Sequence, residues 1–110
     1  MLIGTFHEAG PGYSGRITTL TLDAALAIVP AAPSDTENAP NWRVLLGEAD
    51  STIEVGAGWD RTGERAGPYI ALQIEDPALP ASLRANLIRS ARDEGEHHLL
   101  WSRPQPQDRS

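Results

Sequence analysis

The segment Thr52–Asp60, TIEVGAGWD, decides the fold, because every second residue in it is apolar and the residues between are polar or glycine. A turn-rich stretch follows at residues 61–68, and the alternation resumes in Tyr69–Glu75, YIALQIE. Two alternating runs around a glycine-containing turn predict a β-hairpin with one buried face. The hairpin indicates an all-β protein, but it contains no reactive group from which a function follows.

Further extended segments are predicted on both sides of this hairpin. Residues 2–6 form a short apolar run, Tyr13–Asp23 is rich in β-branched residues, and residues 41–46 alternate again. Such residues suit a pleated, half-buried surface. The proline-bounded residues 33–40 predict a loop. We therefore expect one antiparallel sheet of roughly six to eight short strands, curled into a small barrel or sandwich.

Residues 82–94 are consistent with two structures. Leu83, Leu87 and Ile88 follow helical spacing, and on this pattern alone a short helix is slightly favoured. The same segment also fits a strand, with Leu83, Ala85 and Leu87 on one face. The residues of this segment leave both alternatives open.

The chain is 110 residues long, which is the length of one domain. We expect a single β domain over residues 1–103 and a disordered tail over residues 104–110, which contain no apolar residue. The absence of cysteine excludes disulfides, thiolate zinc sites and cysteine nucleophiles. We see no signal peptide and no membrane-spanning stretch, and we expect a cytoplasmic protein without membrane association.

The formal net charge of −6 argues against nonspecific binding to nucleic acid, which depends on cationic contacts to phosphate. All 9 basic residues are arginine, a bias that a GC-rich coding sequence explains more simply than selection for carboxylate or phosphate partners. The segment from Leu79 to Arg92 contains Arg84, Arg89 and Arg92 and no acidic residue. It is the one locally basic stretch of an acidic sequence.

The three tryptophans are predicted to be core residues. Trp42, Trp59 and Trp101 share strand parity with aliphatic neighbours, so each is expected on a buried face rather than on an exposed platform for nucleotide bases. A polar face is predicted instead around Tyr69, whose parity is opposite to that of the apolar residues of its strand. The candidate binding residues on this face are Tyr69, Gln73, Arg61, Arg65 and Arg84.

No catalytic, metal or cofactor site is predicted. His97 and His98 are adjacent, and adjacent strand residues point to opposite faces, so one metal ion cannot easily bind both. The carboxylates at residues 75–76 and 93–96 lie in predicted turns, where nothing indicates the burial that acid–base catalysis needs. The glycines at residues 10, 12 and 15 precede β-branched residues, whereas a phosphate loop requires the start of a helix. We therefore expect a protein that is not an enzyme.

Several blocks of sequence, taken in order, carry a family resemblance. They are residues 3–6 (IGTF), 12–20 (GYSGRITTL), 39–44 (APNWRV), 54–59 (EVGAGW), 69–77 (YIALQIEDP) and 99–103 (LLWSR). Together they resemble the bacterial family known as domain of unknown function 736. The resemblance implies a small all-β protein encoded near conjugative-transfer genes, without defined catalytic residues. It also implies an extended segment over residues 83–92, which favours the strand there.

This chain departs from the family pattern at the tryptophan hairpin. Relatives often carry lysines there, whereas this chain has Asp60, Arg61 and Glu64. A role in phosphate binding is therefore less expected for this chain than for those relatives.

The sequence thus predicts a non-catalytic binding or assembly protein of a mobile genetic element. The expected partner is another protein, or a second copy in a homodimer, contacted through sheet edges or through the polar face around Tyr69. The alternative is a small β-barrel that binds single-stranded nucleic acid, in which Arg84 and Arg92 share a face if their segment is extended. A mimic of the phosphate backbone is a weaker third hypothesis, because the acidic residues have no regular spacing.

Overall fold

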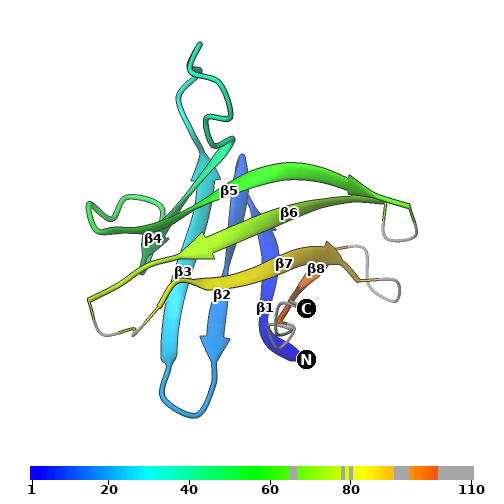
Figure 1. Cartoon of the computed structure of the whole chain (residues 1–110). Coiled ribbons are helices and arrows are strands. Elements are labelled where there is room, and N and C mark those ends of the chain that lie inside the picture. The colour runs from blue at the N-terminus through cyan, green and yellow to red at the C-terminus, as the bar shows by residue number, and fades with distance from the viewer. Residues whose placement is uncertain (65–66, 78, 80, 91–94, 102–110) are drawn as a thin grey trace, which may run out of the picture.

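The computed structural model describes residues 1–64, 67–77, 79, 81–90 and 95–101, and these form eight β-strands without a helix (Figure 1). The strands are β1 (Leu2–Ala9), β2 (Gly12–Thr18), β3 (Asp23–Pro30), β4 (Trp42–Leu46), β5 (Glu54–Gly63), β6 (Gly67–Ile74), β7 (Leu83–Arg89) and β8 (Glu96–Leu100). Within the described part of the chain, no helix has the length and apolar character needed to cross a membrane. The tail expected at residues 104–110 lies outside the described residues.

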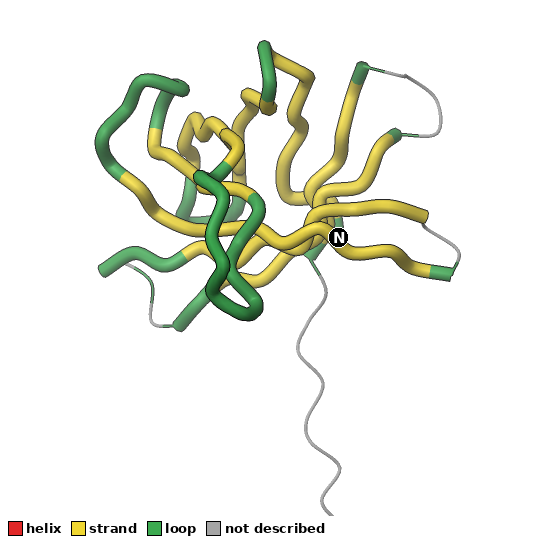
Figure 2. Tube along the Cα trace, turned by 90° about the horizontal axis from the view of Figure 1, so that it is seen from above, coloured by secondary structure: helices red, strands yellow, loops and turns green. Residues whose placement is uncertain are grey.

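The strands form one antiparallel sheet that closes on itself. Each strand pairs with the next along the chain, and β8 pairs with β1, so the order around the barrel is the order in the sequence. The closing ladder extends past both strands, because Met1 and Trp101 exchange two hydrogen bonds of 2.8 Å between their backbone nitrogens and carbonyls. In the view from above, the described part of the chain consists of strands and connecting loops (Figure 2). The predicted all-β sheet is confirmed, and it is a barrel rather than a sandwich.

The segment that fitted either a helix or a strand is the strand β7. Leu83, Ala85 and Leu87 each pair with an inward-facing residue of β6, whereas Ile88 of the helical pattern faces the other way and is only partly buried. β7 is hydrogen-bonded to β6 and β8 on its two sides, and this pairing overrides the helical spacing. The helix is therefore wrong over residues 83–89, while residues 91–94 lie outside the described residues.

The core lies inside the barrel and receives apolar side chains from all eight strands. Phe6, Ile28 and Leu99 are completely buried there, at 0% exposure. An eight-stranded barrel has an interior just wide enough for side chains to fill. Glycine at an inward position makes room among them: a Cβ added at Gly58 would lie 2.7 Å from Leu72 Cδ2. The centre of the barrel is therefore packed, which leaves the outer surface and the open ends for binding.

The connection between β3 and β4 projects beyond the barrel, at the top of Figure 1. It contains the proline-bounded stretch that was predicted as a loop, and it ends at Asn41. The Asn41 N–H donates to the Gly58 carbonyl over 2.9 Å, and Asn41 Oδ1 accepts from the Asp60 N–H over 2.9 Å. These hydrogen bonds hold the end of the loop against the part of β5 that extends past β4.

Candidate functional site

The structure corrects the expected position of Trp59. On β5, Gly56 and Gly58 pair with inward-facing residues of β6, so Trp59 points to the outer face of the barrel and is only partly buried. The alternation is interrupted beside Val55, where the register between β4 and β5 shifts. Val55 and Trp59 are an even number of residues apart, so regular alternation would put them on the same face. Because of the register shift, Val55 belongs to the core and Trp59 does not. The predicted core role of Trp59 is wrong for this reason.

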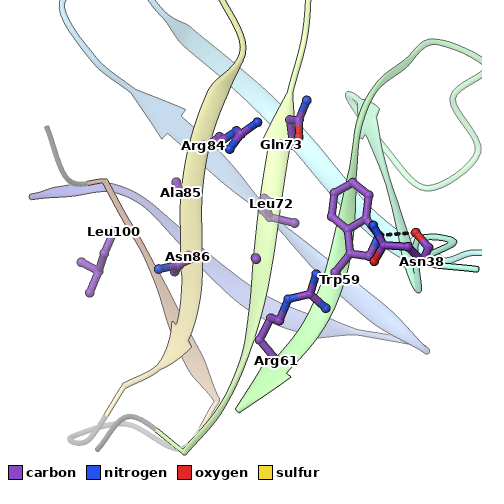
Figure 3. A pocket seen from close by; sticks show the side chains of 10 residues that line it. Asn38, Trp59, Arg61, Leu72, Gln73, Arg84, Ala85, Asn86 and Leu100 are labelled. Atoms are coloured by element: carbon purple, nitrogen blue, oxygen red, sulfur yellow. Dashed lines mark hydrogen bonds between the residues drawn. The ribbon is translucent and has the colours of Figure 1, made fainter. Parts of the chain in front are cut away.

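Trp59 borders a concavity on the outer face of β5, β6 and β7 (Figure 3). Cross-strand pairing places Trp59, Ala71 and Asn86 in one row, with Gln73 and Arg84 paired in the next. Because alanine occupies the middle of the first row, the larger side chains around it enclose a hollow of about 430 Å³. We call this hollow the outer-face concavity, and its polar and aromatic lining consists of Asn38, Trp59, Arg61, Gln73, Arg84 and Asn86.

The indole of Trp59 is held at one side of this concavity by the loop between β3 and β4. Its Nε1–H donates to the carbonyl of Asn38 over 3.0 Å, as the dashed line in Figure 3 shows. Asn38 has a positive φ of 63°, a conformation that asparagine tolerates better than most residues. The hydrogen bond satisfies the polar end of the ring and leaves its apolar part along the hollow.

Arg61 and Arg84 bring positive charge to the concavity. Arg16 and Arg43, elsewhere on the barrel, each pair with an acid of the neighbouring strand, at 2.6 Å and 3.0 Å. Neither Arg61 nor Arg84 forms an ion pair with another described residue, and Arg61 Nη1 donates only to the Asp60 carbonyl, over 3.1 Å. Both guanidinium groups are therefore available to an incoming acidic group.

Glu75 lies beside the concavity, at the end of β6. Its Oε2 accepts hydrogen bonds from Ser82 Oγ at 2.9 Å and from Gln73 Nε2 at 3.0 Å. These two bonds, the one from Ser82 first, hold the pKa of Glu75 below its usual value, and the charge of Arg84 lowers it further. Glu75 is thus ionised at neutral pH, but its bonding partners are uncharged side chains rather than Arg84.

The structure brings most of the predicted binding residues onto this one outer face. Tyr69 and Gln73 point outward from β6, where Arg61 pairs with Tyr69 and Arg84 pairs with Gln73. Arg65 lies outside the described residues. Sequence reasoning missed Trp59, Asn38 and Asn86, and for Asn86 the signal was available, because it has the same strand parity as Arg84.

The locally basic stretch does not form a continuous track. Arg84 points outward, whereas Arg89 pairs with the inward-facing His97 and lines the end of the barrel. Arg92, which was expected to share a face with Arg84, lies outside the described residues. Among the described residues, this segment therefore gives single charges to two separate surfaces.

The other two tryptophans pack against the core cluster and are partly buried. Trp42 faces the interior near one open end of the barrel, where its Nε1–H donates to Asp60 Oδ1 over 2.7 Å. Trp101 lies at the junction of the chain ends, next to Met1. Of the three tryptophans, only Trp59 is on the outer face.

A second group of functional side chains surrounds one open end of the barrel, which we call the barrel mouth. These side chains border a hollow of about 510 Å³. The signal that sequence reasoning missed is that polar residues at strand ends share parity with core residues: Glu8 follows Phe6 by two positions, and His97 precedes Leu99 by two. The charged and aromatic lining of the mouth is Glu8, Tyr13, Trp42, Asp60, Arg61, Tyr69, Arg89 and His97.

The rings and charges of the barrel mouth act on one another. The Tyr13 ring lies 4.7 Å from the His97 ring in an edge-to-face arrangement and 5.6 Å from the Trp42 ring. Burial raises the pKa of Tyr13 above its usual value, and the negative charges of Glu8 and Asp60 raise it further. Tyr13 is therefore a neutral hydroxyl donor over the whole physiological pH range.

Burial also lowers the pKa of His97, a residue that is 8% exposed. Desolvation lowers the pKa of His97 below its usual value; Glu8 opposes this effect, and Arg89, His7 and His98 add to it. His97 is thus a neutral imidazole at neutral pH. Its Nδ1 is buried and has no hydrogen-bond partner among the described residues.

We expect the melting temperature to fall between about pH 7 and about pH 5, in part because of His97. The unfolded chain binds a proton near the ordinary histidine pKa of about 6.5. Folded His97 has a lower pKa, so below about pH 6.5 the unfolded state holds more protons and unfolding becomes easier until the folded pKa is passed. Thermal melts followed by circular dichroism should show a smaller fall for His97→Gln than for the wild type.

The neighbouring histidine supplies the control for this prediction. His98 points to the other face, with its Nε2 2.5 Å from Glu96 Oε2. The variant His98→Gln should keep the part of the acid-induced fall that His97 causes. If the melting temperature of His97→Gln fell as much between pH 7 and pH 5 as that of the wild type, His97 would not be a cause of the fall.

The two histidines therefore have separate surroundings rather than a common ligand site. Over the described ranges, no group of three or more histidine, cysteine, aspartate or glutamate residues is placed to hold a metal ion. Glu94, which was considered with them, lies outside the described residues.

Comparison with known protein families gives one match. A family model described as protein of unknown function (DUF736) matches residues 2–104. The chain belongs to the DUF736 family. No curated protein and no solved structure matches this DUF736 chain. The site described above is therefore argued from its own geometry.

Proposed function

We propose that this chain is a non-catalytic binding protein that docks a protein partner on the outer-face concavity. The observation that carries the proposal is the outward position of Trp59 beside two arginines that form no ion pair with another described residue. Tryptophan, tyrosine and arginine are the residues that most often dominate binding energy at protein interfaces. Here Trp59, Arg61 and Arg84 line one hollow, and Tyr69, which pairs with Arg61, points outward from β6 next to it.

The lining of the concavity indicates what it would accept. An apolar side chain would lie against Trp59 and Ala71, and the amides of Gln73 and Asn86 supply hydrogen bonds. Arginine pairs with carboxylates through two parallel N–H donors, which makes such contacts stronger than neutral hydrogen bonds. We therefore propose that the docked segment carries an apolar anchor flanked by aspartate or glutamate.

The closed barrel favours this face over strand addition. A partner or second copy adds a strand only where a sheet edge is unpaired. Here β1 and β8 pair with each other and every other strand has two neighbours. Contact with a partner, or self-association as a homodimer, would therefore use side chains of the outer face rather than an edge.

The proposal also includes the genetic and cellular context of the protein. We propose a role in a mobile genetic element, which follows from the implied conjugative-transfer context of the family, and a cytoplasmic location. The partner is then expected among the products of the neighbouring genes.

Binding of single-stranded nucleic acid is a second candidate, because an outward Trp59 between Arg61 and Arg84 is able to stack a base. The net charge of −6 and the separation of Arg84 from Arg89 weigh against it. A labelled oligonucleotide titrated across a salt series decides between the two. Nucleic-acid binding requires an affinity that falls steeply with salt and that Trp59→Ala abolishes.

The docking proposal is tested by photo-crosslinking from the lining of the concavity. Asn86, which is exposed on β7, is replaced by the photoreactive p-benzoylphenylalanine, in cells that express the chain together with its neighbouring genes. We expect a protein adduct from position 86 and none from Ser14, an exposed position on β2, across the barrel from β6. An adduct of twice the mass of the chain would show self-association, a nuclease-sensitive adduct would favour nucleic acid, and no adduct would contradict docking on this face.

A charge variant of the crosslinking protein adds a control. Arg61→Ala combined with Arg84→Ala should lower the adduct at least about tenfold, since hydrogen bonds to charged groups contribute about 1.5–3 kcal/mol each. The matched control is Arg16→Ala combined with Arg43→Ala, which changes the net charge equally but alters arginines that already have carboxylate partners. Equal losses in the two double variants would mean that net charge, rather than the concavity, attracts the partner.

A further inference from the structure

The barrel mouth is divided electrically into two halves. Glu8, Tyr13, Trp42 and Asp60 come from β1, β2, β4 and β5, which lie together with β3 along one side of the barrel. Arg89 comes from β7, on the opposite side. One hollow of about 510 Å³ therefore has the acidic and aromatic groups, with Arg61 of β5 next to Asp60, on one side and the guanidinium of Arg89 on the other.

The acidic half is built around two aromatic rings. The Tyr13 and Trp42 rings are 5.6 Å apart and tilted by 53°, so they present π surfaces in two directions. Asp60 accepts a hydrogen bond from Trp42 through Oδ1, which leaves Oδ2 for another donor. Glu8 pairs with Tyr13 across the β1–β2 ladder and makes no ion pair with another described residue. Aromatic rings next to carboxylates are the surroundings in which proteins bind organic ammonium groups.

The basic half offers a site for an anion. Arg89 lies opposite His97 in the β7–β8 ladder and, within the described ranges, forms no ion pair. Arg61, at the rim between the mouth and the outer face, is likewise without a carboxylate partner among the described residues. A guanidinium presents a planar set of donors that matches a carboxylate.

His97 is a buried polar residue in the wall of the mouth. It is 8% exposed, and its Nδ1 is buried without a hydrogen-bond partner among the described residues. An unsatisfied buried polar atom costs about 1–3 kcal/mol, so its retention in a packed barrel needs a reason. His97 lines the hollow opposite Arg89 in the β7–β8 ladder, and Glu8 and Arg89 both act electrostatically on its ring.

We propose that the barrel mouth binds a small zwitterion that carries an organic ammonium group and a carboxylate. The ammonium group lies against Tyr13 and Trp42, near the carboxylates of Glu8 and Asp60. The carboxylate binds Arg89. The mouth of a barrel is a common place for one small ligand. Arg61 borders both the mouth and the outer-face concavity, but the residues proposed to contact the zwitterion do not line the concavity. The zwitterion proposal does not depend on the function proposed for the outer face.

The test is isothermal titration calorimetry of the full chain with γ-butyrobetaine, in which three methylene groups join a trimethylammonium group to a carboxylate. We expect saturable binding with a Kd of about 0.1–1 mM, the range of a small ligand held by few contacts. Butyltrimethylammonium, which keeps only the cation, and butyrate, which keeps only the anion, should each bind at least about tenfold more weakly. No saturable heat with γ-butyrobetaine, or equal binding of the cation alone, would overturn the proposal.

Two exposed residues allow the charges to be removed without disturbing the core. Glu8→Gln and Arg89→Gln should each weaken the binding of γ-butyrobetaine at least about fivefold, because each removes one charged contact of roughly 1 kcal/mol or more. The matched controls Glu48→Gln and Arg16→Gln change exposed charges away from the mouth and should leave the Kd unaltered. An unchanged Kd in either Glu8→Gln or Arg89→Gln would overturn the zwitterion assignment.

A spectroscopic measurement locates the bound ligand. In a ¹H–¹⁵N correlation spectrum, γ-butyrobetaine should shift the indole N–H signal of Trp42, which is hydrogen-bonded to Asp60 in the mouth. The signal of Trp59, which is bonded to Asn38 on the outer face, should stay in place. A shift of the Trp59 signal alone would place the ligand outside the mouth and overturn the proposal.

Discussion

Replacing Phe6 with alanine is expected to lower the free energy of unfolding by about 3–5 kcal/mol. Phe6 is completely buried, at 0% exposure, inside a barrel whose strands are paired on both sides. The backbone has little freedom to close the space that the ring leaves, so the loss combines the transfer of the ring to water with the cost of a cavity. Urea unfolding followed by circular dichroism gives the value, which is a large share of the roughly 5–15 kcal/mol typical of a domain.

Two further variants show whether this effect belongs to the core. Phe6→Leu keeps most of the volume and should cost less than about 2 kcal/mol. Trp59→Ala removes a larger ring but from the outer face, where we expect a loss of about 1 kcal/mol from one hydrogen bond and partial burial. A loss in Trp59→Ala as large as that in Phe6→Ala would show that Trp59 is a core residue after all.

Gly15→Ala is expected to cost about 3 kcal/mol, at the upper end of the usual range for overpacking. Gly15 pairs with Phe6 across the β1–β2 ladder, and its inward side faces the Phe6 ring. A Cβ at this position would lie 2.2 Å from the Thr5 carbonyl oxygen and 2.6 Å from Phe6 Cγ. The nearest atom belongs to the backbone, so two paired strands must separate to accept a single methyl group.

The neighbouring residue on β2 supplies the control for this prediction. Ser14 is exposed on the outer face, and Ser14→Ala should change the free energy of unfolding by less than about 0.5 kcal/mol. The same urea titration compares both variants with the wild type. A Gly15→Ala protein as stable as Ser14→Ala would mean that β1 and β2 are not as close as the structure places them.

The part of the candidate site that the sequence predicted lies on an uninterrupted strand. In β6, Tyr69 and Gln73 alternate with the buried Ile70, Leu72 and Ile74 without a break, so parity alone was enough to place them outside. The register shift beside Val55 breaks the same argument on β5, and Trp59 was therefore predicted on the wrong face. Local alternation predicts a face only as far as the pairing of the strand stays regular.

The barrel mouth was beyond prediction for a different reason. Its residues come from strands that are far apart in the sequence, and Glu8 and His97 become neighbours only because β1 pairs with β8. No short spacing or motif records that closure. In the sequence, each of these residues is visible only as a polar residue at a strand end, spaced by two from a core residue. The same pattern occurs where the end of a strand is simply exposed to solvent.

The sequence by itself determined that the chain is built of short antiparallel strands, because alternation of side chains and turn residues are local properties that each segment carries alone. It also determined the polar face around Tyr69. Only the tertiary structure decided that the sheet closes into a barrel, that β7 is a strand, that Trp59 lies outside and that a charged mouth exists. These features depend on which strands pair and on how much room the interior has, and both are properties of the whole sheet.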